Sequence, residues 1–429
     1  MTYADTLEFL YNQLPMFHRV GAAAYKANLD NTITLSNLLG NPQNSFKTIH
    51  VAGTNGKGST SHLLASILQE AGFKTGLFTS PHYNDFRERI KIDGKMIPEE
   101  AVTRFIEKWK DDFVKIGLSF FEMTAGLAFD FFGDEKVDFA VIEVGLGGRL
   151  DSTNIINPLV SVITNIGLDH TQFLGDTLEK IANEKAGIIK SGTPVVIGET
   201  QDETEPVFEN VAKAKNAPIT FADKNFQVSS EIVLKDGHKK LEISRKGVSF
   251  LQIQNFQLNG TFQLKNVVTV VQTIQVLKEQ GIKISDENLI KGIENVFKNT
   301  GLLGRWQILG NSPLVICDSG HNVDGIREVV KDLDNLKPKK LHFVLGMVND
   351  KDIGGILGLL PKDATYYFCK ANIPRGLDAA TLASQALAFG LSGTVFPSVK
   401  EAYQTALTEC KNDEVVFVGG SIFVVAEVL

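Results

Sequence analysis

The sequence is poor in cysteine, with only Cys317, Cys369 and Cys410 among 429 residues. An odd number of widely separated cysteines fits neither a disulfide framework nor the paired spacing of a structural zinc site. We therefore expect a protein of the reducing cytoplasm. The first residues, MTYADTLEFLYNQLP, carry acids and amides where a secretory signal needs a basic and then an apolar stretch, so export is not predicted.

Positive charge and long apolar runs are also scarce. Lys and Arg total 43 against 50 Asp and Glu, which gives a net charge of −7 and disfavours binding to a polyphosphate backbone. The most apolar window, VVFVGGSIFVVAEVL, is shorter than the ~20 residues of a membrane helix and contains Gly419, Gly420 and Glu427. We expect a buried strand followed by a short helix there, and neither a nucleic-acid nor a membrane partner.

What is present is a repeating pattern of short Val- and Ile-rich runs, each followed by a glycine-containing turn and then by helical spacing. This pattern predicts an α/β protein with a mainly parallel sheet covered on both faces. The length favours more than one domain. The clearest strands are predicted at 48–52, 139–144, 159–164 and 195–197, and the clearest helices at 59–70, 101–114, 122–132 and 177–186.

The pattern changes twice along the chain. Residues 225–258 alternate polar and apolar side chains around the turn KDGHKK, which predicts a small excursion of β-hairpins. Helices are expected at 263–280 and 285–297, and the segment KNTGLLG after them has little periodicity. We therefore place a domain boundary there, with one domain at 1–299 and a second, smaller α/β domain at 300–429.

The strongest motif is HVAGTNGKGS, residues 50–59, in which a predicted strand ends in a glycine-rich turn that opens a helix. Such a turn lets backbone amides close on a phosphate, and Lys57 adds a point charge. The spacing is not that of a strict P-loop, because Val51 stands six residues before Lys57 and Gly58 replaces the metal-binding hydroxyl. The alternative is a turn that only connects a strand to a helix.

The magnesium ligands must then come from other strand ends. Glu143 ends the strand FAVIEV, His170 follows LVSVITNIGLD, and Ser80 follows GLFT. Ligands of open α/β sheets bind at the carboxyl edge, and hydrated Mg²⁺ needs few protein ligands. Each residue taken alone has a structural alternative, such as a helix cap or a hydrogen-bonding histidine.

Two segments of the second half are further candidates. Arg305, in Gly-Arg-Trp, is placed to reach nucleotide phosphates. Asp318 and His321 follow the strand LVIC, where the carboxylate could accept a ribose hydroxyl and the imidazole could orient a phosphate. A hydrogen bond that only stabilises the loop is an equal alternative for this pair.

With these residues in view, the sequence resembles the Mur ligase superfamily, and within it folylpolyglutamate synthases, including the bacterial dihydrofolate synthase type. The resemblance runs in order through IHVAGTNGKGST, FTSPH, FRERI, FFEMTAGLAF, IEVGLGGRLDSTN, LDHTQFLGDTLEKIANEKAGIIK, GTFQLKN, GRW and DSGHN. The N-terminal stretch 19–42 is similar to bifunctional bacterial forms. The resemblance implies a P-loop-type first domain and a Rossmann-like second domain.

The resemblance also implies roles for individual residues. The residues implied to bind ATP are Asn55, Gly56, Lys57, Gly58, Ser59, Asn266, Arg305 and Asp318, with His321 near the phosphates. The implied magnesium ligands are Ser80, Glu143 and His170, and Lys185, otherwise read as a helix-end cation, becomes a carbamylated ligand of a second Mg²⁺. The implied substrate contacts are Leu29, Asp30, Phe120, Phe121, Glu122, Leu150, Asp151 and Ser152.

The implied reaction is ATP-dependent addition of L-glutamate to dihydropteroate or a reduced folate through an acyl phosphate, by a monomer. Two departures from the usual pattern are Arg87 before Glu88 and the run Asp-Ser-Gly-His-Asn-Val at 318–323. We expect the first to affect the folate-side loop and the second to affect loop packing only. Two rival functions are a Mur-type ligase acting on a cell-wall nucleotide and a catalytically silent nucleotide-binding scaffold. About 50 residues precede the phosphate loop, which is short for the extra domain of cell-wall ligases.

Overall fold

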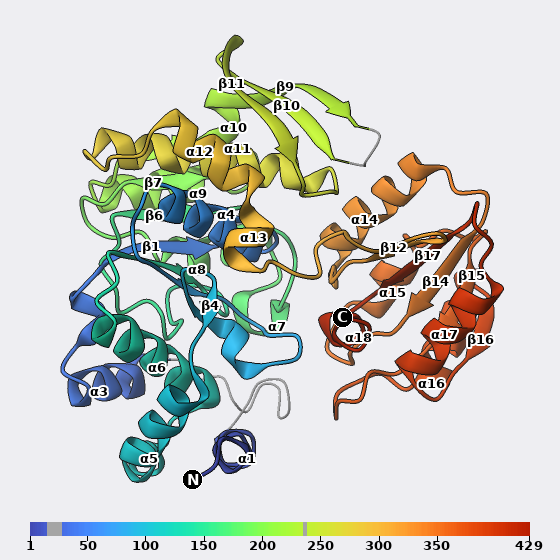
Figure 1. The fold of residues 1–429 in the computed structure, drawn as a ribbon, viewed down its shortest axis with the longest axis horizontal. Helices are drawn as coiled ribbons and strands as arrows, with labels where there is room; N and C mark the ends of the chain where they lie inside the picture. The colour runs from blue at the N-terminus through green and yellow to red at the C-terminus, as the bar shows by residue number, and fades with distance from the viewer. Residues whose placement is uncertain (15–27, 235–237) are drawn as a thin grey trace. The chain divides into compact units, whose positions relative to one another are not determined.

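The computed structural model describes residues 1–14, 28–234 and 238–429. Two predictions lie partly outside these residues, namely the stretch 19–42 and the turn at 235–240. The chain forms two compact units (Figure 1). Unit 1 comprises Met1–Gly167, Thr171–Gln257 and Leu264–Leu302, and unit 2 comprises Leu168–His170, Leu258–Gln263 and Leu303–Leu429.

Unit 1 is built on an eight-stranded sheet in the order β4-β3-β2-β5-β1-β6-β7-β8. The six strands from β2 to β8 in this order are parallel to one another. At the other edge, β3 pairs antiparallel with β2, and β4 pairs antiparallel with β3. The strands are β1 (Lys47–Ala52), β2 (Thr75–Phe78), β3 (Ile90–Ile92), β4 (Lys95–Met96), β5 (Phe139–Glu143), β6 (Val160–Ile163), β7 (Val195–Ile197) and β8 (Ile219–Phe221). The predicted α/β class with a mainly parallel sheet is confirmed.

Helices cover both faces of this sheet, which explains why β5 is buried at every position. Helix α4 (Lys57–Glu70) packs on β1, β2 and β5. On the other face, alternate residues such as Ala140 and Ile142 join a core with helices α3 (Asp30–Leu38), α5 (Glu99–Ile116) and α6 (Phe120–Asp134). The further helices are α1 (Tyr3–Gln13), α7 (Thr171–Leu174), α8 (Leu178–Ala186), α9 (Glu205–Ala214), α10 (Ala222–Asn225), α11 (Phe262–Glu279), α12 (Asp286–Glu294) and α13 (Val296–Thr300).

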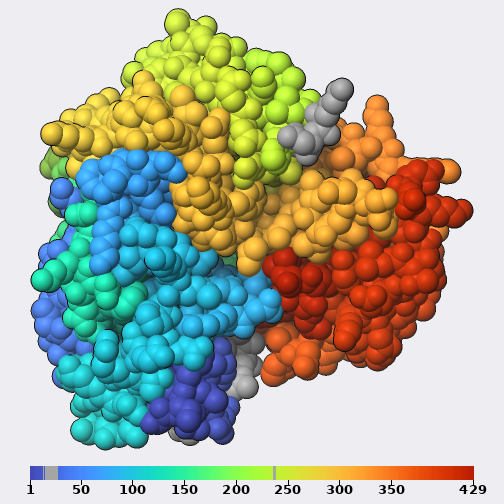
Figure 2. Space-filling view, in the orientation of Figure 1, coloured from blue at the N-terminus to red at the C-terminus, as the bar shows by residue number. Residues whose placement is uncertain are grey.

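The predicted β excursion is a three-stranded antiparallel sheet in the order β11-β10-β9. Its strands are β9 (Phe226–Val233), β10 (Lys239–Arg245) and β11 (Val248–Phe256). Strand β11 packs against α12, and in the space-filling view these strands form the upper surface of unit 1 above the yellow helices (Figure 2).

Unit 2 contains a six-stranded sheet in the order β12-β13-β17-β14-β15-β16. All neighbours are parallel except β12, which pairs antiparallel with β13. The strands are β12 (Gln307–Asn311), β13 (Leu314–Cys317), β14 (Leu341–Leu345), β15 (Thr365–Phe368), β16 (Gly393–Val395) and β17 (Val415–Gly419). The helices are α14 (Val323–Leu336), α15 (Ile353–Leu357), α16 (Ala379–Leu387), α17 (Val399–Glu409) and α18 (Ile422–Ala426). The apolar C-terminal window is the expected strand and short helix.

The structure differs from the sequence prediction at the end of unit 1. The predicted helix 285–297 is two helices, α12 and α13, and α13 continues through Thr300 into the segment expected to be irregular. It ends at Gly301, whose φ of 61° suits a left-handed cap. The units divide between Leu302 and Leu303, and the sequence boundary between 299 and 300 stays a prediction. Among the described residues, no helix is long and apolar enough to cross a membrane.

Candidate functional site

The glycine-rich loop after β1 has a backbone that only glycine tolerates at two points. Gly53 has a φ of 148° and Gly56 a φ of 83°, and α4 begins at the next residue, Lys57. A Cβ atom on Gly56 would lie 2.2 Å from Asn266 Oδ1, and one on Gly53 would lie 1.8 Å from Thr164 Oγ1. The strand, glycine-rich turn and helix follow one another as the sequence predicted, and the loop places the start of α4 beside Asn266.

Strand β6 holds this loop in place through the residues that follow it. Asn165 accepts from two loop amides, with its carbonyl oxygen 3.0 Å from Thr54 N and its Oδ1 2.9 Å from Asn55 N. The Thr54 hydroxyl accepts from Gly167 N at 2.9 Å. Because these bonds hold the loop from outside, its shape is set before any ligand binds.

Two lysine side chains converge on the carbonyl groups of the loop. Lys57 Nζ lies 3.1 Å from the carbonyl oxygens of both Gly53 and Thr54. Lys185, near the end of α8, is only 4% exposed and donates from Nζ to the Gly53 carbonyl at 2.8 Å. Lys185 is thus inside the site and not a solvated cation at a helix end.

One buried hydroxyl tests whether the loop fits a ligand. Ser59 Oγ, in the first turn of α4, is buried and has no hydrogen-bond partner among the described residues. A buried hydroxyl without a partner is costly, whereas a phosphate oxygen or a metal-bound water would satisfy it. The residues of the loop therefore fit a bound nucleotide phosphate.

The ends of β5 and β2 bring a carboxylate and a hydroxyl residue together. The buried Glu143 accepts a hydrogen bond from Ser80 N, with its Oε2 3.0 Å from that nitrogen. Both residues lie at the carboxyl edge, where β2, β5, β1 and β6 are successive neighbours. This oxygen-rich pair suits Mg²⁺.

The residues of α6 that were predicted to contact substrate cap this helix or pack against neighbouring residues. Glu122 is buried and forms a capping box with Ser119, accepting from Ser119 N at 2.7 Å. The Phe120 ring lies against the rings of Tyr11 and Phe86. The Phe121 ring fills the space beside Gly145, where a Cβ would be 2.3 Å from its Cζ.

The loop after β5 is organised by Asp151. Its carboxylate accepts from Leu146 N at 2.8 Å, from Thr153 N at 3.0 Å and from the Thr153 hydroxyl. Burial raises the pKa of Asp151 against the lowering effect of these bonds. The neighbouring Ser152 is buried and Leu150 is half-buried. Asp151 thus shapes the loop on which the predicted substrate contacts lie.

At the start of α3, Leu29 is half-buried and Asp30 is exposed. Asp30 N lies 3.3 Å from Asn28 Oδ1. Arg87 pairs with Asp85, with Nη2 2.6 Å from Oδ2, and its guanidinium lies over the Tyr3 ring. This unusual arginine therefore ties the loop before β3 to α1.

In unit 2, Asp318 organises the turn that carries Arg305. Its two carboxylate oxygens accept from Trp306 N and Gly320 N, both at 2.7 Å. Trp306 has a φ of 45°, a left-handed conformation that the bond to Asp318 helps to hold. Burial raises the pKa of Asp318, and the charge of Arg305 opposes that rise. Asp318 therefore has the loop-stabilising role that the sequence allowed. Each of its carboxylate oxygens still has a second lone pair that could accept another hydrogen bond.

The carboxylate of Asp169 is surrounded by cationic and polar side chains. Its Oδ2 lies 3.1 Å from Asn322 Nδ2, 3.5 Å from His321 Nε2 and 3.9 Å from His170 Nε2, and Lys351 pairs with Oδ1. Burial alone would raise the pKa of Asp169, but His321 and the nearby positive charges bring that pKa well below its usual value. Within unit 2, His170 and His321 therefore share one carboxylate.

Sequence reasoning assigned no role to two buried polar groups beside the site. Arg89 is fully buried, donates from Nε to His82 Nδ1 at 2.7 Å and lies over the Phe120 ring. Burial lowers the pKa of Arg89 to about 10, and burial with the Arg89 charge lowers the pKa of His82 to about 3. His50 Nε2 lies 2.8 Å from Thr153 Oγ1, so β1 also supports the Asp151 loop. The sequence signals were that His50 opens the motif HVAGTNGKGS and that His82 and Arg89 fall within FTSPH and FRERI.

Comparison with known proteins identifies two family domains in this chain. Residues 51–274 match the Mur ligase middle domain, and residues 304–422 match the Mur ligase glutamate ligase domain. A folylpolyglutamate synthase of Lacticaseibacillus casei is 31% identical over 443 residues, which cover 100% of this chain and 98% of that protein. The chain spans about half the length of two archaeal relatives, among them a probable bifunctional folylpolyglutamate synthase/dihydropteroate synthase of Haloferax volcanii that is 32% identical over 435 residues.

Two solved structures show what similar proteins hold. Escherichia coli FolC, in complex with DHPP and ADP, has a TM-score of 0.86 and 31% identity, covering 100% of this chain and 97% of that one. The bifunctional folylpolyglutamate synthase/dihydrofolate synthase of Yersinia pestis, complexed with AMPPNP and a Mn ion, has a TM-score of 0.84 and 30% identity, covering 100% and 97%.

The fold and the match to both Mur ligase domain models define an α/β protein of the Mur ligase type. Within that class, the chain belongs to the folylpolyglutamate synthase/dihydrofolate synthase family. Proteins of this family are ligases that form carbon–nitrogen bonds, and the solved relatives bind adenine nucleotides and a divalent metal ion.

Proposed function

We propose that this protein is an ATP-dependent amide ligase that adds L-glutamate to dihydropteroate and to the γ-carboxylate of folylglutamates, giving ADP and phosphate. The observation that carries this proposal is the loop after β1, where Lys57 and the unpartnered Ser59 hydroxyl lie within one turn of α4. Family membership and the match to a glutamate ligase domain support the choice of substrates.

The chemistry requires activation of a carboxylate. A carboxylate resists attack by an amine because its negative charge repels the nucleophile and it has no leaving group. Transfer of the γ-phosphoryl of ATP to this carboxylate gives an acyl phosphate, and attack by the glutamate amine then expels phosphate. The protein must therefore bind and orient the triphosphate, stabilise charge on the transferring group and exclude water.

The residues of the loop are suited to the nucleotide part of this task. We assign Asn55, Gly56, Lys57, Gly58 and Ser59 to the phosphates because the loop directs helix-start amides and one ammonium group to one place. Asn266 lies directly beside Gly56, which supports its assignment to the nucleotide. On unit 2 we assign Arg305, Asp318 and His321. Asp318 holds the turn next to Arg305, and His321 follows in the same loop with its Nδ1 2.9 Å from the Ser319 carbonyl oxygen.

We propose Mg²⁺ as the metal ion, held by Ser80, Glu143 and His170. The supporting observation is the buried Glu143 carboxylate hydrogen-bonded to the backbone of Ser80. When bound, the ion would neutralise charge on the phosphate oxygens.

We also propose that Lys185 is carbamylated and serves a second metal site. An unmodified ammonium group at this place could pair with a phosphate but could not ligate a cation. A metal site here therefore requires a modified lysine. Reaction of the neutral amine with CO₂ forms an N–C bond and releases one proton, which gives a carbamate with two oxygens just beyond Nζ. The buried Nζ of Lys185, 2.8 Å from the Gly53 carbonyl, is where such a group would face the loop.

For the substrate we retain the predicted contacts Leu29, Asp30, Phe120, Phe121, Glu122, Leu150, Asp151 and Ser152. Their support is their clustering on α6, the loop after β5 and the start of α3. Because Glu122 and Asp151 are held by backbone amides, we assign them to shaping these segments and not to catalysis.

Phosphate release measured with ATP, L-glutamate and either dihydropteroate or tetrahydrofolate tests the proposal. We expect glutamate-dependent phosphate release with both pterin substrates. Release with tetrahydrofolate alone would restrict the function to chain extension, and release with dihydropteroate alone would restrict it to the first glutamylation. ATP binding without release in either reaction would contradict the proposed function.

A further inference from the structure

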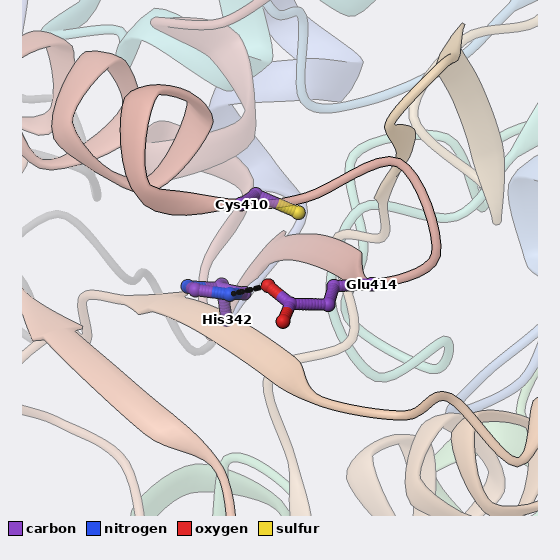
Figure 3. A group of neighbouring side chains, drawn as sticks. All are labelled: His342, Cys410 and Glu414. Carbon is purple, nitrogen blue, oxygen red and sulfur yellow. Dashed lines mark hydrogen bonds and ion pairs between the residues drawn. The ribbon is translucent and has the colours of Figure 1, made fainter.

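A cluster of three potential metal ligands lies in unit 2 at the amino ends of two neighbouring strands. His342 is the second residue of β14, Glu414 precedes β17, and Cys410 follows α17. One donor atom from each lies within 4.8 Å of the others. Figure 3 shows the Cys410 sulfur and the Glu414 carboxylate beside the imidazole ring.

The hydrogen bonds around His342 orient the ring so that its Nε2 faces Glu414. Nδ1 lies 2.8 Å from Tyr367 Oη, and that hydroxyl donates to Glu409 Oε2 at 2.6 Å. Since an ionised carboxylate only accepts, the tyrosine oxygen must accept from Nδ1–H. Nε2 lies 2.9 Å from Glu414 Oε2, which is a second acceptor. The contact between Nε2 and Glu414 can hold a proton, carried by the ring or by the carboxyl group, or it can open to admit a metal ion.

The burial of this ring is compatible with a metal ion. His342 is 0% exposed, and its Nε2 faces the Glu414 carboxylate, which can balance the charge of either a ring proton or a bound cation. A neutral imidazole whose Nδ1–H is held by a polar chain is the usual arrangement of a metal-ligating histidine. Glu414 is already oriented, because Lys411 N donates to its Oε2 at 3.0 Å.

The nature of the three donors selects the kind of ion. A thiol sulfur, an imidazole nitrogen and a carboxylate oxygen form a set typical of Zn²⁺ and ions of similar softness, not of Mg²⁺. The Cys410 sulfur lies within reach of the other two donor atoms, and its thiol would release its proton on binding a cation. Zinc–ligand bonds of roughly 2.0–2.3 Å require the His342–Glu414 contact to open slightly and Cys410 to move inward.

We propose that His342, Cys410 and Glu414 form a structural site for a divalent transition metal ion of the zinc class, with water as the fourth ligand. The ion would join the end of α17 to the amino ends of β14 and β17. Asp318 follows the carboxyl end of β13, which runs parallel to β17, so it belongs to the opposite edge of this sheet. The site is therefore separate from the residues assigned to the reaction, and the proposal departs from the expectation that no cysteine serves a zinc site.

Cobalt and zinc titrations of the full chain test this site. The protein, first dialysed against a chelator, is titrated with Co²⁺ or Zn²⁺ in the presence of excess Mg²⁺ and ADP. We expect one equivalent of Co²⁺ to give a near-ultraviolet thiolate-to-cobalt band. Cys410→Ser should abolish the band and weaken Zn²⁺ binding at least ~100-fold, and Tyr367→Phe should weaken it by ~10-fold or more.

Cys369→Ser is the matched control, because Cys369 is a buried free cysteine in the same unit. This variant should keep both the band and the zinc affinity. Circular dichroism establishes that each variant is folded. A cobalt complex without a thiolate band, or equal zinc binding by the wild type and Cys410→Ser, would overturn the proposal.

Discussion

Replacing Gly56 with alanine is the sharpest test of the phosphate loop, because the structure supplies a matched control. The new Cβ would lie 2.2 Å from Asn266 Oδ1, at a residue with a φ of 83°. Gly72, beyond the other end of α4, has a φ of 85° and open space around its Cβ position. Both variants therefore carry the same left-handed backbone penalty of about 1–2 kcal/mol, and only one carries the steric conflict.

The expected difference between the two variants follows from that conflict. Overpacking costs about 1–3 kcal/mol if Asn266 stays in place. If Asn266 rotates away instead, the stability is spared but the proposed nucleotide contact is lost, which we expect to weaken ADP binding by about tenfold, or about 1.4 kcal/mol. The assays are urea denaturation and calorimetric titration with ADP. Equal stability and equal ADP affinity of Gly56→Ala and Gly72→Ala would refute the close approach of the loop to Asn266.

Three further predictions follow from single residues. Lys57→Ala should abolish phosphate release with little change in melting temperature. The control variant Lys180→Ala, at an exposed lysine, should stay active. A turnover of Lys57→Ala above ~10% of the wild-type value would remove Lys57 from the mechanism. Lys185→Ala should be inactive and partly rescued by formate or acetate, whereas full activity without rescue would exclude a metal-binding carbamate. Burial and Asp134 raise the pKa of Asp130 to about 6, so the folded state binds the extra proton between about pH 4 and 6 and loses stability as the pH rises. Because Asp130 is only half-buried, solvent screens part of this effect, and Asp130→Asn should stabilise the protein by about 1–2 kcal/mol at pH 7 but not at pH 4. Identical pH profiles in urea denaturation would contradict this.

Local patterns were enough to predict most of the elements that build the site. The predicted strand 48–52 is buried at every position because β1 lies in the middle of the sheet, and the glycines after it specify the turn into α4. Edge elements were harder to find, because they have little apolar patterning. Strand β12 is half exposed and was not predicted.

Contacts between distant residues limited what the sequence alone could predict about the site. Lys185 and Gly53 are 132 positions apart, so no local pattern reveals that the ammonium reaches the phosphate loop. Only the family resemblance pointed to this lysine. Asp318 illustrates the opposite case, because the sequence allowed both a ligand role and a loop-stabilising role, and the hydrogen bonds to Trp306 and Gly320 show that the second is present.

Oxygen transfer during ligation tests the central claim most directly. A pterin substrate whose reacting carboxylate is labelled with ¹⁸O is incubated with ATP, L-glutamate, Mg²⁺ and the protein, and the released phosphate is examined by mass spectrometry. Attack of the carboxylate on the γ-phosphorus, followed by expulsion of phosphate by the amine, predicts one ¹⁸O atom in each phosphate formed. Amide formation accompanied by phosphate without ¹⁸O would contradict the account.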